Sequence, residues 1–359
     1  MPYLQINPHY FIDNLQVIKS IIGEDEGHKI AIVLKDNAYG HGLVELAKIS
    51  SEAGITSCFV KNTQEAIEVA KWFEHISILY PQSLESETLL KSCIQRENIY
   101  FCVANIESLD LYPPKSKIEL KINSGMNRNG IQINKLQEAL KKSLENKLEI
   151  VGVFSHNGFG DNIGSEFYAQ NDSNLHIKRE VLQFCKANSL KKPRFHFLSS
   201  SGALRAAKYN VSLPIELQDD LYRIGIALYG YLCQDSMLYE VQLKPIASLW
   251  AKKISTQLLK KGSRIGYGGI SKVDEDMLVS TYDIGYGDGL FRVREGMELF
   301  TKEGLKIFPR ASMDCISIQG DCEEVCIFDD VRPWAEAFGT IPYEILSHLH
   351  SYIPKKILQ

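Results

Sequence analysis

The strongest constraint on the fold is an alternation that runs through about the first 230 residues of the chain. Short apolar runs rich in β-branched residues alternate with stretches whose apolar side chains recur at helical spacing. This pattern predicts βα units around a parallel sheet. The runs expected as strands are Ala31–Lys35, Ser57–Val60, Ser77–Tyr80, Ile99–Ala104, Ile118–Ile122, Ile150–Ser155, Arg194–Leu198 and a run ending near Arg223–Gly225. Eight such strands favour a closed (β/α)8 barrel of the TIM type, and an open doubly wound sheet is the alternative.

Beyond about residue 235 the chain changes character, because helical spacing gives way to Val, Ile, Ser and Thr runs separated by glycine. The strands expected there are Ile246–Leu259, Met277–Tyr282, Glu298–Thr301, Leu305–Phe308, Cys315–Gln319 and Glu324–Phe328, followed by a helix at Tyr343–His350. A length of 359 residues exceeds what one typical core supports. We therefore expect two domains, a barrel at residues 1–235 and a mostly β domain at residues 236–359.

Charge and composition exclude several classes of function. The formal net charge is −4 and the sequence has no long basic run, so neither nucleic acid nor a membrane surface is an expected partner. No apolar run approaches the length of a membrane span, and no secretory signal opens the chain, so a cytoplasmic location is expected. The eight cysteines are scattered without metal-ligand spacing, which indicates free thiols in a reducing compartment and no metal site.

Catalytic groups of such barrels lie at the carboxyl ends of the strands and in the loops that follow, where this sequence places several polar segments. Lys35 is the most informative residue among them, because it directly follows the apolar residues 31–34. An enclosed stem with an amine at the barrel mouth would lower the pKa of that amine and make it a nucleophile toward a carbonyl group. The alternative is a lysine that simply extends to solvent at a strand end.

A second segment has the composition of a phosphate site. Ser199–Gly202 follows the seventh expected strand and Gly225–Ile226 follows the eighth, which is where TIM barrels bind phosphate. Hydroxyl groups and free N–H groups at a helix N-terminus suit a dianion, although a plain helix cap has the same sequence pattern. A strand-end lysine together with a phosphate cradle indicates a carbonyl cofactor that carries phosphate, and pyridoxal 5′-phosphate (PLP) is the expected one.

Six segments, in the same order along essentially the whole chain, resemble the motifs of the alanine racemase family. They are Lys35–Gly42, Lys121–Arg128, Arg223–Gly230, Ile265–Gly268, Gly285–Gly289 and Ser312–Asp314. The resemblance implies an enzyme that interconverts L-alanine and D-alanine with PLP and supplies D-alanine for bacterial peptidoglycan.

The resemblance also implies which two acid–base groups transfer the protons at the substrate Cα. Inversion at the substrate Cα needs one proton removed from one face and another delivered on the opposite face. Lys35 would hold PLP covalently and serve the D-alanine face, and Tyr267 would serve the L-alanine face. In this family that tyrosine reaches the cofactor of the other subunit. The resemblance therefore implies a homodimer with shared active sites. Met313 would also come from the partner subunit and lie beside the substrate carboxylate.

Further roles follow from the same resemblance. Arg223 would face the pyridine nitrogen of PLP, and His156 would lie beside its ring. Arg128 would hold the substrate carboxylate, with Lys121, a lysine often carbamylated in this family, orienting it. The phosphate positions are Tyr39, Ser200, Gly225, Ile226 and Tyr352, while Tyr286 and Asp314 correspond to positions where the substrate enters and the partner is contacted.

The sequence departs from the family pattern at several positions. Asp36 replaces the usual alanine, and Ser199 replaces a common asparagine. Around Arg128, the sequence has Asn123, Ser124, Asn127 and Asn129 where the family more often has Asp, Thr, Gly and Leu. These changes beside Arg128 leave open a broad-specificity or serine-type racemase. A binding-only PLP barrel is a further alternative, but it would lack the second domain. A related decarboxylase is disfavoured, because it would need an acidic residue in place of Arg223 and a cysteine in the partner loop.

Overall fold

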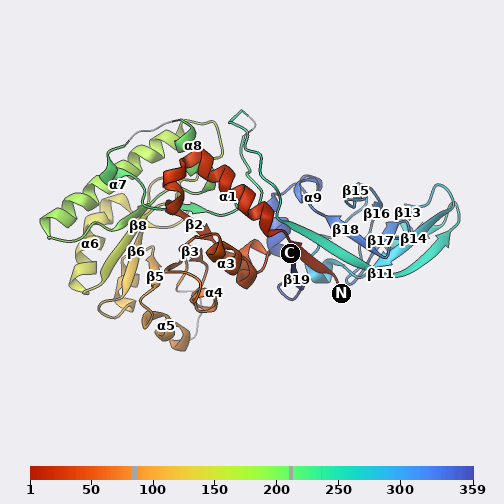
Figure 1. Ribbon diagram of the computed structural model, residues 1–359, viewed down its shortest axis with the longest axis horizontal. Helices are drawn as coiled ribbons and strands as arrows, with labels where there is room; N and C mark the ends of the chain where they lie inside the picture. Colours follow the sequence, from red (N-terminus) through yellow and green to blue (C-terminus); the bar gives the residue numbers. More distant parts are fainter. Residues whose placement is uncertain (82–86, 210–212, 236) are drawn as a thin grey trace.

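The computed structural model describes residues 1–81, 87–209, 213–235 and 237–359. Figure 1 shows two lobes side by side, with the barrel in red to green and a lobe of strands in teal to blue. Both termini lie near the junction of the lobes. One continuous cluster of buried apolar side chains extends from the barrel into the second lobe, so the two lobes pack directly on each other.

The first lobe is the expected parallel barrel. Its strands are β2 (Ile30–Val33), β3 (Ser57–Val60), β4 (His75–Ile78), β5 (Ile99–Val103), β6 (Lys117–Asn123), β8 (Glu149–Phe154), β9 (Arg194–His196) and β10 (Tyr222–Ile224). They pair in the order β10-β2-β3-β4-β5-β6-β8-β9, all in parallel, and the short β7 (Ile131–Gln132) adds to β6. A parallel bridge between Ser199 and Arg223 brings the two ends of this order together, so the barrel is nearly closed and the prediction is confirmed.

The helices cover the outside of this barrel (Figure 1). They are α1 (Pro8–Ile22), α3 (Leu43–Glu52), α4 (Thr63–Val69), α5 (Glu87–Ile94), α6 (Leu136–Glu145), α7 (Glu166–Ala187) and α8 (Ser200–Lys208). Strands β2, β3 and β5 are buried along their whole length, because helices cover one face and the barrel interior the other. Short 3-10 turns fill the connections at η1 (Glu24–Lys29), η2 (Glu107–Leu111), η3 (Ile133–Lys135) and η4 (Ile215–Leu217).

The second lobe is mostly β, as predicted. Its strands are β11 (Ala247–Leu259), β12 (Arg264–Ile265), β13 (Ser271–Lys272), β14 (Met277–Tyr282), β15 (Leu299–Phe300), β16 (Lys306–Phe308), β17 (Ile316–Gln319), β18 (Glu324–Phe328) and β19 (Lys355–Ile357). The turns η5 (Tyr267–Gly269) and η6 (Tyr286–Asp288) and the helices α9 (Arg332–Phe338) and α10 (Pro342–His348) complete it. The long strand β11 organises the sheet, because β14, β18 and β1 all pair with it.

One element of this sheet comes from the opposite end of the chain. Strand β1 (Tyr3–Ile6) pairs antiparallel with β11 and parallel with β19. The chain then enters the barrel through α1, whose first turn is capped by the Asn7 side chain. The N-terminal residues therefore tie the two lobes together.

In the part of the chain that the structure describes, no helix is long and apolar enough to cross a membrane. The cysteines, all of them within the described ranges, are free thiols and most are buried.

Candidate active site

A cavity of about 520 Å³ opens at the carboxyl ends of the barrel strands and contains most of the predicted site residues. Among its described lining residues four cations, Lys35, Lys121, Arg128 and Arg223, face a single carboxylate, Asp161. A concave site with this excess of positive charge favours an anionic ligand.

Lys35 stands at the start of a left-handed turn, α2 (Lys35–Tyr39), which follows β2 after one residue. The φ angles of residues 36 to 39 lie between 52° and 55°. This left-handed backbone conformation is unfavourable for residues other than glycine. The side chain of His41 holds this turn closed, because its Nδ1 lies 3.0 Å from the Ala38 carbonyl oxygen and 3.1 Å from that of Tyr39. The turn directs Lys35 into the cavity, where burial lowers the pKa of its amine.

Asp36, which differs from the family pattern, fits this turn, because aspartate tolerates the left-handed conformation better than alanine does. Its carboxylate accepts a hydrogen bond from Lys61 Nζ at 2.5 Å. Glu65 accepts the backbone N–H groups of Lys61 at 2.6 Å and Asn37 at 3.0 Å. Charged side chains from the loop after β3 and from the first turn of α4 therefore hold the turn that carries Lys35.

The expected phosphate position is a tightly packed cradle. The buried ring of Tyr39 packs between Tyr229 and Tyr343, with ring centroids 5.2 and 5.8 Å away. The Gly225 N–H group donates to Ser200 Oγ at 3.1 Å, at the first turn of α8. A Cβ atom on Gly225 would lie 2.7 Å from Tyr39 Oη, so this position requires glycine. Together with Ile226 in the cavity wall, these residues form a pocket with hydroxyl and N–H donors at a helix N-terminus.

Arg223 is buried at the floor of the cavity and held by acceptors from two neighbouring strand ends. Its Nη2 donates to the Ser155 carbonyl oxygen at 2.6 Å, and its Nη1 donates to the His196 carbonyl oxygen and lies 2.8 Å from His196 Nδ1. Burial lowers the pKa of this guanidinium to about 10, which still leaves it charged at neutral pH. It can therefore donate hydrogen bonds but cannot serve as an acid or an acceptor.

Lys121, on β6, and Arg128, in the loop after β6, also line the cavity. Burial, and secondarily the nearby charge of Arg128, lower the pKa of the Lys121 amine to about 8. Lys121 Nζ also donates to the side-chain oxygen of Asn129. Asn123 organises the loop that carries Arg128, because its Oδ1 accepts the N–H groups of Gly125 at 3.2 Å and Asn127 at 3.0 Å. Asparagine thus supplies the acceptor that an aspartate would supply at this place.

His156 lines the cavity as expected, and burial lowers its pKa to about 3, so it is neutral. Gln170 on α7, which no sequence motif indicated, holds the loop of His156. The Gln170 amide donates to the His156 carbonyl oxygen at 2.9 Å and to Ser124 Oγ at 3.1 Å, and its oxygen accepts the Gly158 N–H at 3.0 Å. Gln170 therefore ties two loops of the cavity wall together.

The predicted residues of the second lobe lie on its surface, outside the lining of this cavity. Tyr267 is 60% exposed in η5, and Met313 is 54% exposed. Tyr286, half exposed in η6, follows Gly285, which packs tightly against the Met313 backbone. Asp314 lies next to this cluster, 3.6 Å from where a Cβ on Gly287 would lie.

Tyr352 does not line this cavity. Its hydroxyl donates to the Gly287 carbonyl oxygen at 2.7 Å in the second lobe. Its role at the phosphate stays a prediction. Tyr343, which the sequence motifs did not single out, lines the cavity and packs on Tyr39.

Comparison with known proteins identifies the family. The family described as "Alanine racemase, N-terminal domain" matches residues 6–233, and "Alanine racemase, C-terminal domain" matches residues 246–357. The chain belongs to the alanine racemase family. Curated relatives named alanine racemase include one from Nitratiruptor sp. (37% identical, covering 99% of both chains) and one from Campylobacter concisus (36% identical, covering 100% of both).

Solved structures of the family agree with the fold. The alanine racemase of Bacillus anthracis with bound L-Ala-P is 26% identical, covers 100% of this chain and 95% of its own, and has a TM-score of 0.80. The alanine racemase of Clostridium difficile has a TM-score of 0.84 at 23% identity, covers 99% of this chain and 95% of its own, and supports the fold alone. Because the family match extends through the second lobe, this alanine racemase family member differs from a single-domain barrel that only binds cofactor.

Proposed function

We propose that this chain is a PLP-dependent alanine racemase that interconverts L-alanine and D-alanine and supplies D-alanine for peptidoglycan synthesis. The proposal is supported mainly by three features that converge in one cationic cavity. They are the amine of Lys35, the expected phosphate pocket around Gly225, and the guanidinium of Arg223, which can only donate hydrogen bonds. We also propose a cytoplasmic location, which the scattered free thiols support.

The cavity fits PLP by the chemistry of its donors. The cradle of Ser200, Gly225 and Tyr39 would hold the phosphate, and Lys35 would form the covalent link to the cofactor aldehyde. When bound, PLP withdraws electrons from the substrate and so acidifies its Cα–H bond. Arg223 would donate to the pyridine nitrogen and leave that nitrogen without a proton, which limits electron withdrawal by the ring and disfavours side reactions.

The tight packing around Gly225 gives a first prediction. Gly225→Ala would place a methyl group 2.7 Å from Tyr39 Oη, and the ring cannot move aside because Tyr229 and Tyr343 enclose it. We expect the Kd for PLP to rise at least about tenfold, which corresponds to roughly 1.4 kcal/mol. Titration of cofactor-free protein with PLP measures this, and thermal unfolding of the same sample separates a binding defect from misfolding. An unchanged Kd would contradict the assignment of the cradle.

The two proton positions come from different subunits in the proposed enzyme. Lys35 would move the proton on the D-alanine face, and Tyr267 of the partner subunit would move it on the L-alanine face. The exposure of Tyr267 and Met313, together with exposed Ile341 at the cavity wall, supports a homodimer in which the second lobe of one subunit closes the cavity of the other. We also propose the division into domains at residues 1–235 and 236–359, with strand β1 (Tyr3–Ile6) of the first segment paired into the sheet of the second lobe.

The substrate carboxylate would bind Arg128, whose orientation we assign to a carbamylated Lys121. Carbamylation needs a neutral amine, and a pKa of about 8 gives Lys121 a larger neutral fraction near neutral pH than an ordinary lysine has. We expect ¹³C-labelled bicarbonate to give a carbamate NMR signal that grows as the pH is raised through about 8, because the lowered pKa makes the amine neutral above that value. The signal should be absent from Lys121→Ala. Its absence from the unaltered protein would show that Lys121 acts as a plain lysine.

Racemisation of alanine, serine and lysine, measured side by side, tests the substrate class. Alanine is expected to have the highest kcat/KM, because the loop geometry around Arg128 is kept by Asn123. A higher kcat/KM for serine would replace the proposal with a serine-type racemase, and comparable values for all three would indicate broad specificity.

A further inference from the structure

A column of polar side chains runs through the barrel core below the candidate active site. Arg223 contacts His196 on β9, and His196 Nε2 lies 3.2 Å from Glu119 Oε1 on β6. The same carboxylate oxygen accepts a hydrogen bond from Arg194 Nε at 2.7 Å. Glu119 and His196 are completely buried, and barrel cores are normally filled with branched apolar residues. A row of hydrogen-bonded charged side chains inside the barrel therefore needs a functional explanation.

The chemistry of the groups fixes the direction of each hydrogen bond. The Arg223 guanidinium can only donate, so His196 Nδ1 must be the acceptor and the ring proton must lie on Nε2. That proton then points to Glu119. Burial lowers the pKa of His196 to about 4, so the ring is neutral. Burial raises the pKa of Glu119, but Arg194 and His196 outweigh this effect and keep the carboxylate ionised.

The rings on both sides hold His196 in this orientation. The Phe154 ring stacks on it with centroids 4.6 Å apart, and Phe59 lies 5.1 Å away on a tilted plane. A histidine that donates to a carboxylate is a stronger acceptor at its other nitrogen, as in carboxylate–histidine–metal arrangements. Here the other nitrogen faces Arg223 instead of a metal.

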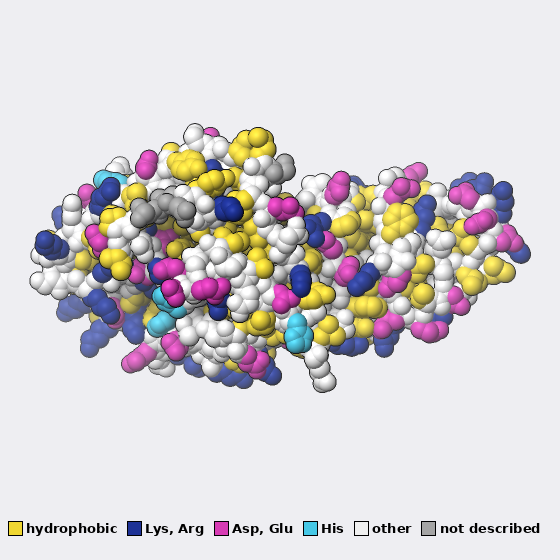
Figure 2. All heavy atoms as spheres, turned by 45° about the horizontal axis from the view of Figure 1, so that its top comes forward, with side chains coloured by type: hydrophobic (Ala, Val, Ile, Leu, Met, Phe, Trp, Pro, Cys, Tyr) yellow, Lys and Arg dark blue, Asp and Glu magenta, His cyan; other side chains and the backbone are white. Residues whose placement is uncertain are grey.

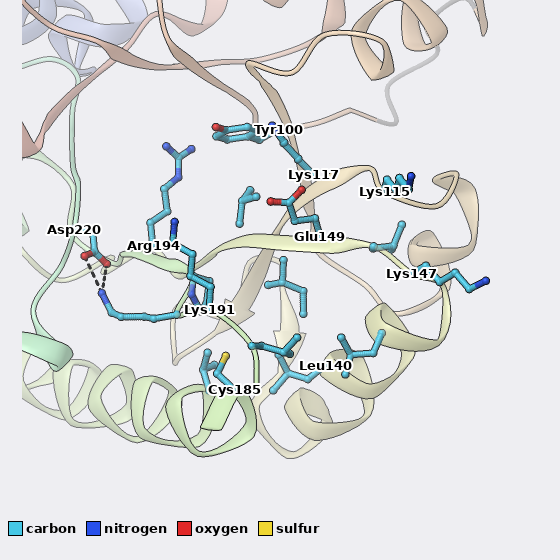
Figure 3. Close-up of a pocket in the computed structure, with 18 of the residues that line it drawn as sticks. Tyr100, Lys115, Lys117, Leu140, Lys147, Glu149, Cys185, Lys191, Arg194 and Asp220 are labelled. Carbon is cyan, nitrogen blue, oxygen red and sulfur yellow. Dashed lines mark hydrogen bonds and ion pairs between the residues drawn. The ribbon is translucent and has the colours of Figure 1, made fainter. Parts of the chain in front are cut away.

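The far end of the column reaches a second cavity. Arg194 and Tyr100 line a groove of about 840 Å³ at the amino ends of the barrel strands, and Figure 3 shows both side chains facing it. The Arg194 guanidinium lies 4.7 Å from the Tyr100 ring centroid, and its Nη2 donates to Ser77 Oγ at 2.8 Å. Figure 2 shows basic side chains gathered around the end of the barrel lobe farthest from the second lobe. Arg194 is therefore the accessible end of a chain whose inner end is Arg223.

We propose that Glu119, anchored by Arg194, is a positioning residue that acts through His196 to hold the Arg223 guanidinium in the orientation required at the cofactor ring. This inference rests on the proposed function, because it takes Arg223 as the contact of the PLP pyridine nitrogen. It assigns no contact with substrate or cofactor to Glu119 itself.

Glu119→Gln tests the proposal, because it keeps the shape of the side chain and removes its charge. In PLP-bound, full-length protein with ¹⁵N-labelled histidine, we expect the His196 Nε2–H proton signal to move upfield, since an amide is a weaker acceptor than a carboxylate. His196→Gln assigns that signal. We expect kcat for alanine to fall about tenfold with KM unchanged, because Arg223 does not bind the substrate carboxylate. The absorbance spectrum of the bound cofactor should change as well.

Asp220→Asn is the matched control. Asp220 accepts hydrogen bonds from Lys192 at 2.6 Å and from the Phe195 N–H at 2.7 Å, so its loss disturbs the same strand without touching His196. This variant should keep kcat, the Nε2–H signal and the cofactor spectrum. An equal loss of kcat in both variants would overturn the proposal, because it would reduce the effect to general destabilisation of β9.

If Glu119→Gln does not fold, a pair of Arg194 variants tests the positioning role of Glu119. Arg194→Lys keeps a cation beside Glu119 and should preserve kcat, while Arg194→Met should lower it and move the Nε2–H signal in the same direction. Unchanged signals, spectrum and kcat in Glu119→Gln or in Arg194→Met would overturn the proposal. Failure of the unaltered protein to bind PLP or to racemise alanine would refute the proposed function instead, and the His196 signal would still report the hydrogen bond to Glu119.

Discussion

Lys35→Ala is expected to abolish racemisation, with a loss of kcat on the order of 10⁴-fold or more, because one side chain supplies both the cofactor link and a proton-transfer group. The structure explains why no other lysine would take over. The left-handed turn from Asp36 to Tyr39 directs Lys35 into the cavity, where burial lowers the pKa of its amine. Lys121, which also lines the cavity, donates a hydrogen bond to Asn129.

The measurement is racemase activity together with borohydride trapping of the cofactor. Unaltered protein should be yellow and should retain one covalently reduced cofactor on Lys35, identified by peptide mass. The variant should trap none. Lys48→Ala, which removes an exposed lysine of α3 that pairs with Glu52, is the control and should behave as the unaltered protein. Trapping on another lysine, or full activity in Lys35→Ala, would contradict the assignment.

Tyr267→Phe is expected to lower kcat about 10²- to 10⁴-fold in both directions while PLP remains bound, because inversion needs a proton-transfer group on each face. Tyr10→Phe removes the hydroxyl of another exposed tyrosine, on α1, and should leave activity unchanged. Racemisation at the normal rate in Tyr267→Phe would exclude the two-group mechanism proposed here.

A subunit-mixing experiment separates a shared site from a site within one chain. Tyr267 lies outside the cavity that holds Lys35 of its own chain. Mixing inactive Lys35→Ala and Tyr267→Phe subunits should therefore restore about a quarter of the activity, because half of the dimers are mixed and each has one intact site. No recovery in demonstrated mixed dimers would place both groups in one chain.

The barrel was predictable because most of its strands are short apolar runs separated by stretches with helical spacing. Strands β3 and β14 have the expected bounds, whereas β4 begins two residues earlier, at His75 rather than Ser77. Strand β1 was not predicted, since Tyr3–Ile6 is stabilised by pairing with Ala247–Trp250, more than two hundred residues away. Helix α9 was also missed, because Pro at its first turn and only a short apolar face give a weak periodic signal.

Site residues on sequence motifs were predictable, and residues that support them from the barrel interior were not. Lys35, Arg128, His156 and Arg223 line one cavity as expected. Glu119 and His196 carry no motif, but a signal was present. In strand β6 the polar residues Glu119, Lys121 and Asn123 alternate with Ile118, Leu120 and Ile122, and all six are buried. Polar residues at every second position of a buried strand indicate that they face the barrel axis, as they do here.

Incubation of purified, PLP-bound protein with L-alanine, followed by separation of the enantiomers on a chiral column, tests whether this chain interconverts the enantiomers of alanine with PLP on Lys35. We predict that the mixture reaches equal amounts of L- and D-alanine and that Lys35→Ala forms no D-alanine. Unchanged L-alanine in the presence of protein with bound PLP would show that the chain is not an alanine racemase.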